Sequence, residues 1–466
     1  MKRDKLYIFL LCVLNAFTVF NRAYGINVII FIIPLLIFLY KYLKANNLIA
    51  NRNGLLFMIP ITILSSSYFI YDNVFTRLNY IAIPVLYILM YIFTIRKEYN
   101  LFGIIGDSLT ILFAPFGCIG KMFSSLSKDL KVVIKEENRK KILSILIVSP
   151  IVLIILVLLG SADTVFGNLF KDLFEYIDLL HNLGSFILKS LFALVLFIYL
   201  ASTMVFLKEY QNAQIIDTTF GIKIEEYTMK VLLTSLNVIY VVFDIIQINS
   251  LMLHRVSQDI NYAEYARSGF FQLMVISLIN IVIILLSKKS KETKYNRNMS
   301  LVMIGLTFII IVSSFMRMYL YESAFGYTIL RLGVYIILIT EVILFVPTIM
   351  YILNKKINII RSYAMIITAV YTVINIFSAD RVITINNLNR DEKMNYLDVT
   401  YLENHHYDNL PLLIDFYKEC KDETIKNELK TYFNNMINES KNEEFNILEF
   451  NLSKKHGLEK LKSISL

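Results

Sequence analysis

Apolar residues along this chain are gathered in long blocks that short polar connections separate. The blocks hold about 18 to 24 residues, enough for a helix to cross a hydrocarbon core about 30 Å thick. Strands of an outer-membrane barrel would instead alternate apolar and polar residues. We therefore predict an all-α polytopic transmembrane helix bundle of about eleven spans, at residues 6–20, 26–43, 54–71, 80–95, 142–161, 184–207, 228–250, 269–287, 299–318, 328–351 and 363–379.

Composition supports this reading. Of 466 residues, 56% are hydrophobic and 18% are charged, whereas a soluble domain has about 45–50% apolar and about 25% charged residues. A cytosolic enzyme, a secreted disulfide scaffold and a nucleic-acid-binding module are excluded on this ground. Trp is absent, so we expect many of the 30 Tyr to serve as interfacial anchors.

Lys and Arg in the connections indicate the orientation, because cytoplasmic loops carry an excess of both. With the N-terminus inside, 26 basic residues before residue 381 lie on the cytoplasmic side and 8 lie outside or near the outer ends of spans. An odd number of spans then places the C-terminus outside. The net charge of +9 is therefore an orientation signal and not a nucleic-acid signal.

One apolar stretch, residues 101–120, does not read as a span because Gly, Pro and Asp107 interrupt it. Counting it as a span would move the later basic connections outside. We expect it to be re-entrant or interfacial. Lys121 to Lys141 alternates apolar residues with seven Lys or Arg. It predicts an amphipathic helix on an anionic lipid surface, with a solvated cytoplasmic helix as the alternative.

The composition changes after Asp380. Residues 381–466 hold 12 Lys or Arg and 15 Asp or Glu, with apolar residues at helical spacing. They predict a small helical extracytoplasmic domain. The expected units are therefore an N-terminal four-span unit (1–95), a cytoplasmic re-entrant and amphipathic segment (96–141), a seven-span core (142–380) and the extracytoplasmic domain (381–466).

Ionisable residues at membrane depth are costly and are candidates for function. Glu341 lies near the middle of its span, and Asp244 lies near the outer end of its own. A neutral acid or a polar packing contact is the alternative for both. Asn237 and Asn280 lie near the centres of consecutive spans, where they could bond to each other.

A second candidate site is an outer polar cluster in a region otherwise poor in basic residues. Its members are Arg317, Tyr321, Glu322 and Arg331 in one connection and Tyr262, Glu264 and Arg267 in another. Arg presents a planar fork to carboxylate or phosphate. The cluster is therefore either an anion-binding vestibule or a salt-bridge lattice that fastens two helical hairpins.

Three segments carry a resemblance to a known family: Arg317 to Arg331, Tyr262 to Arg267 with the following Gly269-Phe270-Phe271-Gln272-Leu273, and Ser161-Ala162-Asp163. Over roughly residues 140–400 the chain resembles an uncharacterised bacterial membrane family, domain of unknown function 4173, which is related to the 4153 group. The resemblance implies a multi-pass protein of the bacterial cytoplasmic membrane. It implies no activity, and it points to the outer cluster as the family's signature.

Catalytic motifs are absent from the sequence. It contains no Walker loop, no His-Glu-x-x-His and no Gly-x-Ser-x-Gly. The adjacent His405 and His406 do not form a metal site, and we expect no metal and no cofactor.

Two functions remain open, and the lack of motifs favours a non-enzymatic protein. The first is envelope sensing, scaffolding or signalling with a protein partner. The second is a secondary transporter or lipid-linked transferase that uses the outer vestibule.

Overall fold

The computed structural model describes residues 2–96, 101–130, 180–210, 224–249, 269–291, 293–389, 407–441 and 446–464. Across these residues the chain is helical, and a single isolated bridge pairs Ile224 with Ser290. Nine of the described helical segments are long and apolar enough to cross a membrane. The prediction of an all-α polytopic bundle is confirmed, although the predicted span at 142–161 lies outside the described residues.

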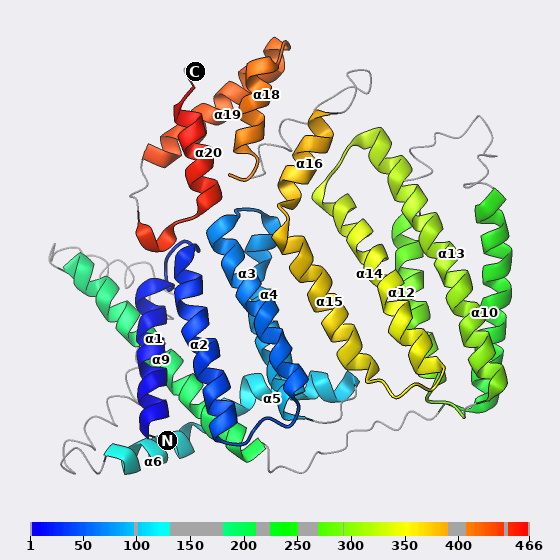
Figure 1. Cartoon of the computed structure of the whole chain (residues 1–466), viewed down its shortest axis with the longest axis horizontal. Coiled ribbons are helices and arrows are strands. Elements are labelled where there is room, and N and C mark those ends of the chain that lie inside the picture. Colours follow the sequence, from blue (N-terminus) through cyan, green and yellow to red (C-terminus); the bar gives the residue numbers. More distant parts are fainter. Residues whose placement is uncertain are drawn as a thin grey trace, which may run out of the picture.

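The first bundle is built from the N-terminal helices (Figure 1). Helices α1, α2, α3, α4 and α9 pack together, with the 3-10 helix η1 leading into α3. Their bounds are α1 Lys2–Thr18, α2 Ile26–Ala45, η1 Arg52–Phe57, α3 Met58–Ile70, α4 Val74–Ile95 and α9 Leu180–Tyr210.

The second bundle is built around α13, the longest described helix, which contacts α10, α12 and α14. Helix α15 lies between the two bundles and contacts α14 on one side and α3 and α4 on the other (Figure 1). The bounds are α10 Glu226–Gln247, α12 Phe270–Ser287, α13 Lys294–Phe325, α14 Ile329–Ile352 and α15 Ile359–Ile376.

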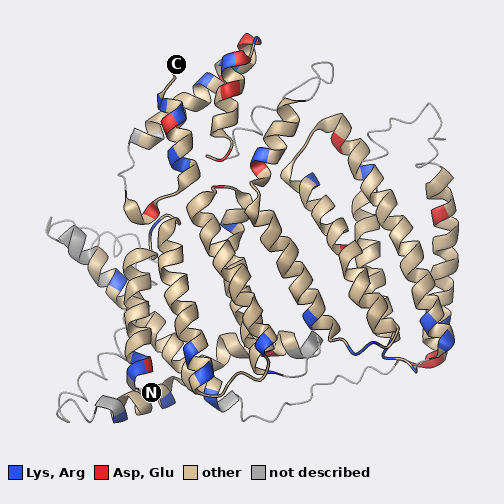
Figure 2. Ribbon diagram, in the orientation of Figure 1, with Lys and Arg blue, Asp and Glu red and all other residues tan. Residues whose placement is uncertain are grey.

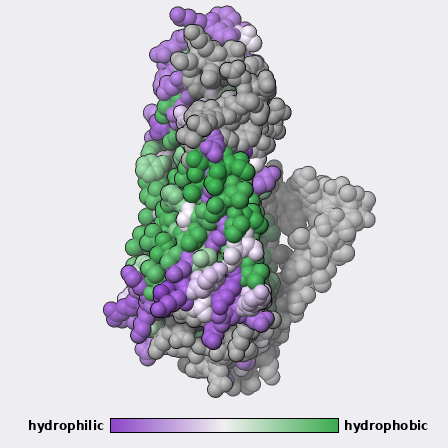
Figure 3. Space-filling model, turned by 90° about the vertical axis from the view of Figure 1, so that its right-hand side faces the viewer, coloured by the Kyte–Doolittle hydropathy of each residue, from purple (hydrophilic) through white to green (hydrophobic). Residues whose placement is uncertain are grey.

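The two ends of these bundles differ in charge. Lys and Arg gather at the end that holds the N-terminus, which we call the basic face (Figure 2). The C-terminal helices lie at the opposite end, the domain face: α16 Ala379–Leu388, α18 Leu410–Glu419, α19 Glu423–Lys441 and α20 Leu452–Lys462. The 3-10 helix η4 (Ile447–Glu449) precedes α20. An apolar belt separates the polar ends in the side view (Figure 3).

The apolar stretch at 101–120 forms α5 (Leu101–Gly117) and leads into α6 (Ile119–Leu130). The two helices are bent by 52° at their junction, and both lie at the basic face (Figure 1). Arg96 at the end of α4 holds α5 through an ion pair of 2.6 Å to Asp107. A re-entrant or interfacial role for this segment stays a prediction.

Side-chain burial is the reverse of that in a soluble protein. Ser277, Asn280, Ser300, Thr307 and Ser313 are fully buried between helices. Large aliphatic side chains on the outward faces of α10 and α12 are exposed, among them Val238, Ile239, Val242, Ile279 and Val282. Hydrocarbon exerts no hydrophobic force between helices, so their contacts depend on close packing and interhelical hydrogen bonds. Lipid is therefore the environment of the exposed faces.

Candidate functional site

Arg317, the first member of the predicted outer cluster, is buried inside the second bundle. Its guanidinium donates to Gln247 Oε1 on α10 at 3.0 Å, and Ser313 donates to the same oxygen at 2.8 Å. Gly269 lies close by with a φ of +94°, and a Cβ at that position would be 3.3 Å from Arg317 Nη1. A glycine is therefore suited to this position both by its backbone conformation and by the room that it leaves for the arginine.

Arg331 has a different role from Arg317. It donates to the carbonyl oxygens of Phe325 (3.0 Å), the last residue of α13, and of Gly326, which caps the helix. Its guanidinium also lies 4.3 Å from the centre of the Tyr321 ring. A cation at the C-terminal end of a helix satisfies the terminal carbonyls and opposes the helix dipole. Arg331 therefore closes the α13–α14 turn.

The outer cluster is thus brought together only in part. Glu322 is buried near the end of α13, 4% exposed, and its carbonyl accepts from the Gly326 amide. Tyr262, Glu264 and Arg267 lie outside the described residues. An anion-binding role for the cluster stays a prediction.

The two intramembrane acids are both buried. Glu341 is 1% exposed, and its Oε2 lies 2.5 Å from Ser277 Oγ on α12. Asp244 is 2% exposed, and neither of its carboxyl oxygens has a hydrogen-bond partner within the described residues. Both side chains therefore sit inside the second bundle and away from lipid.

Further polar contacts continue toward the basic face. Tyr240 donates to Asn280 Oδ1 at 2.8 Å, and Asn280 donates to Thr307 at 3.0 Å. Asn237 donates to the Met299 carbonyl at 3.0 Å. The predicted bond between Asn237 and Asn280 is therefore wrong, because Asn237 bonds to α13 and Asn280 bonds to Tyr240 and Thr307. We call these contacts, with Asp244, Ser277, Gln247, Ser313, Arg317 and Glu341, the polar seam.

A second polar site, which no pattern in the sequence indicated, lies where the C-terminal helices meet the membrane helices. Asp408, which is 2% exposed, accepts three hydrogen bonds. The donors are the Asp72 amide (2.8 Å), Asn73 Nδ2 (3.0 Å) and Ser378 Oγ (2.6 Å). The first two belong to the α3–α4 turn, and Ser378 joins α15 to α16. One carboxylate therefore connects three segments of the chain.

Asn451 makes a comparable contact from the start of α20. It donates to the carbonyl oxygens of Tyr68 and Tyr71, both at 2.9 Å, and its own Oδ1 accepts from the Lys454 amide. The side chain thus caps α20 and satisfies two carbonyls at the end of α3. We call the contacts of Asp408 and Asn451, with those of η4 below, the docking site.

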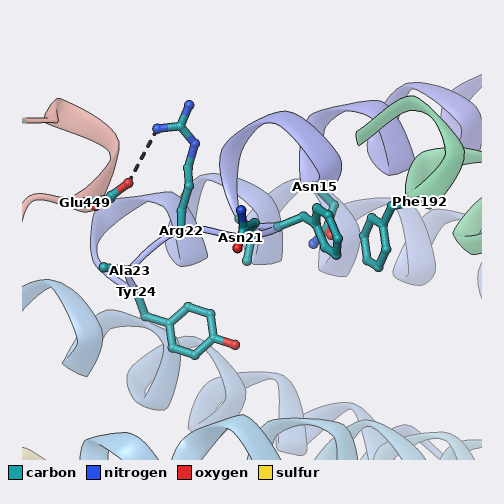
Figure 4. A pocket seen from close by; sticks show the side chains of 9 residues that line it. Asn15, Asn21, Arg22, Ala23, Tyr24, Phe192 and Glu449 are labelled. Atoms are coloured by element: carbon teal, nitrogen blue, oxygen red, sulfur yellow. Dashed lines mark ion pairs between the residues drawn. The ribbon is translucent and has the colours of Figure 1, made fainter. Parts of the chain in front are cut away.

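A cavity of about 660 Å³ lies beside the docking site. It is lined by the α1–α2 connection, α9 and η4, and Figure 4 shows the labelled side chains around it. Two of the lining residues, Arg22 and Glu449 of η4, form an ion pair of 3.5 Å. The Phe450 carbonyl accepts from the Ile26 amide at 3.2 Å. A Cβ on Gly25 would lie 2.6 Å from that carbonyl oxygen.

In the described part of the chain, no three His, Cys, Asp or Glu side chains are grouped so that they could hold a metal ion. His405 and His406 lie outside the described residues. Cys12, Cys118 and Cys420 are all free thiols.

Comparison with known proteins identifies a family but no activity. A family described as a domain of unknown function, DUF4153, matches residues 58–416, about three quarters of the chain. The match begins earlier than the resemblance read from the sequence, and the 4173 label is not confirmed. No curated protein and no solved structure matches the chain. With its bundle of membrane-spanning helices, the chain belongs to the DUF4153 family of unknown function.

Proposed function

We propose that this protein is a non-enzymatic envelope protein that senses or scaffolds, with its C-terminal helical domain as the part that meets a partner. The observation that carries the proposal is the three-bond contact of Asp408 with the α3–α4 turn and Ser378. A partner that displaced the domain would break these bonds. The ends of α3, α4 and α15 would then lose their buried partners.

The second bundle is linked to the same domain. The Tyr327 amide donates to Asn387 Oδ1 at 2.7 Å, and Asn387 Nδ2 donates back to the Tyr327 carbonyl at 2.9 Å. Tyr327 lies in the α13–α14 turn, and Asn387 lies on α16, which contacts α18. Both bundles are therefore held to the C-terminal helices. Such a connection suits a protein that passes a signal from the domain to its membrane part.

The test is a comparison of the proteins captured in living cells by the tagged full-length chain and by Asp408→Ala. Asp415→Ala is the matched control, because Asp415 pairs with Lys460 at an exposed site of the same domain. We expect Asp408→Ala, at wild-type abundance, to change the set of cross-linked partners, and Asp415→Ala to leave it unchanged. An unaltered partner set and unaltered envelope-stress tolerance in Asp408→Ala would count against the proposal.

A second function, secondary transport or lipid-linked transfer of an anion, is favoured by the burial of Arg317 toward the domain face. Arg and its polar partner Gln247 could recognise phosphate or carboxylate if the helices parted. Thermal stabilisation of the purified protein by inorganic phosphate or an anionic lipid, lost in Arg317→Gln, would support it. An equal melting temperature with and without these ligands would argue for a structural arginine.

A further inference from the structure

Two carboxyl groups of the polar seam stand out because the bundle provides so few donors for them. Asp244 on α10 and Glu341 on α14 are 2% and 1% exposed. Neither Asp244 oxygen has a hydrogen-bond partner within the described residues, and Glu341 Oε1 has none either. An ionised carboxylate there would be shielded from water, with no described donor for Asp244 and only the Ser277 hydroxyl for Glu341. Each carboxylate therefore needs a cation to neutralise its charge, and the smallest such cation is a proton.

The helix register places the two groups at one depth. Tyr240 and Asn280 share a hydrogen bond, and α10 and α12 run in opposite directions. Asp244 follows Tyr240 by four residues, and Ser277 precedes Asn280 by three, so both lie about one helical turn, about 5.4 Å, nearer the domain face. Glu341 contacts Ser277. Both carboxyls are therefore one turn from the same hydrogen bond.

The contacts of Ser277 fit a neutral Glu341. Ser277 Oγ lies 2.7 Å from the Met274 carbonyl oxygen and 2.5 Å from Glu341 Oε2. A serine hydroxyl carries one proton, and a carbonyl oxygen only accepts. If Ser277 donates to Met274, the proton in the second contact comes from Glu341. The two contacts are both satisfied when Glu341 is a neutral carboxylic acid.

Among the described residues, no Lys or Arg is in an ion pair with either carboxyl. Neither carboxyl oxygen of Asp244 has a hydrogen-bond donor among the described residues, and the guanidinium of Arg317 donates to Gln247, three residues beyond Asp244. Besides the Lys, Arg and Glu at the basic face, the other titratable groups on the packed helices are Tyr227 and Tyr240 on α10; Tyr295, Tyr319, Tyr321 and Glu322 on α13; Arg331, Tyr335 and Tyr351 on α14; Tyr363 and Tyr371 on α15; and Asp380 and Arg381 on α16. Helix α12 has none.

We propose that Asp244 and Glu341 are two buried proton-exchanging groups at one depth of the second bundle. Each carboxyl takes up one proton from water or releases one proton to water, and no other bond forms or breaks. The Ser277 hydroxyl can donate to an ionised Glu341 or accept from a protonated one, because a hydroxyl both donates and accepts. The site is independent of both functions proposed above, because a sensor and a transporter can each be driven by protonation.

Infrared difference spectroscopy of the full-length protein tests the site, in a detergent without ester groups so that only protein carboxylic acids absorb in the C=O region. We expect wild type to show carboxylic-acid bands at neutral pH that shift in D₂O and disappear as the pH rises. Glu341→Gln and Asp244→Asn should each remove one component. Asp415→Asn, at an exposed carboxylate, should remove none.

Three results would overturn the proposal. The first is the absence of carboxylic-acid bands from wild type at neutral pH. The second is a set of bands that neither shift in D₂O nor respond to pH, which would make the two groups sealed structural acids. The third is loss of the bands on adding sodium at constant pH, which would make the site a metal-ion site. All three use the unmodified protein, so a variant that fails to fold does not obscure them.

Discussion

Removing the Asp408 carboxylate should loosen the C-terminal domain from the membrane helices. In Asp408→Ala the Asp72 amide, Asn73 Nδ2 and Ser378 Oγ all lose their acceptor. Asn73 and Ser378 are themselves 2% and 7% exposed. While the domain stays docked, water has little access to these donors. Bonds to water can therefore replace the bonds to Asp408 only when the domain separates from the membrane helices.

The size of the effect follows from the number of bonds. Hydrogen bonds to charged groups contribute about 1.5–3 kcal/mol each, and neutral ones about 1 kcal/mol. Taking about 1 kcal/mol for each of the three, because they share one acceptor, gives about 3 kcal/mol. Since 1.4 kcal/mol is a factor of ten, the undocked fraction should rise by about 10².

Hydrogen exchange measured by mass spectrometry is the assay, with the Ile26 amide as reporter. This amide donates to the Phe450 carbonyl, so it reports docking without contacting residue 408. We expect exchange of the peptide containing Ile26 to accelerate by up to about 10² in Asp408→Ala. Asp415→Ala removes an exposed ion pair worth about 0–1 kcal/mol and should change exchange by less than about fivefold. Equal exchange in wild type and Asp408→Ala would refute the reasoning.

Two further predictions concern the docking site and the orientation. Gly25→Ala should disrupt docking, because the new Cβ would collide with the Phe450 carbonyl, whereas Gly106→Ala meets nothing within 4 Å and should be neutral or stabilising; limited proteolysis of the C-terminal domain distinguishes them. The orientation can be tested with a membrane-impermeant maleimide on cells whose outer layer has been removed but whose cytoplasmic membrane is intact. The reagent should label Cys420 in the wild-type protein, and it should not label Lys356→Cys in a Cys420→Ser background. The reverse pattern would overturn the predicted orientation.

The helices were predictable from the sequence because few backbone conformations are stable in the hydrocarbon core of a membrane. A long apolar block in a membrane must satisfy its backbone internally, so block length and position define the spans. The start of α14 is equally local, because the Thr328 hydroxyl accepts from the Arg331 amide three residues on. Local signals of this kind depend on a few neighbouring residues.

The docking site was not predictable for the opposite reason. Asp408 and Asn451 bond to partners more than 300 residues away in the sequence. A polar residue at the start of a helix looks the same in sequence whether it meets water or a distant carbonyl. Arg317 and Arg331 illustrate the same limit, because one turns toward α10 and the other closes its own hairpin.

The wide sequence separation at the docking site also concerns the order in which the protein is made. The α3–α4 turn and the α1–α2 connection leave the ribosome long before Asp408 and Asn451. The polar groups of these two connections therefore have no docking partner while the intervening spans enter the membrane. Contacts this distant form late in folding. Docking of the last segment is thus a completion step in biogenesis, and chains that stop before it would present unsatisfied turns to quality-control proteases.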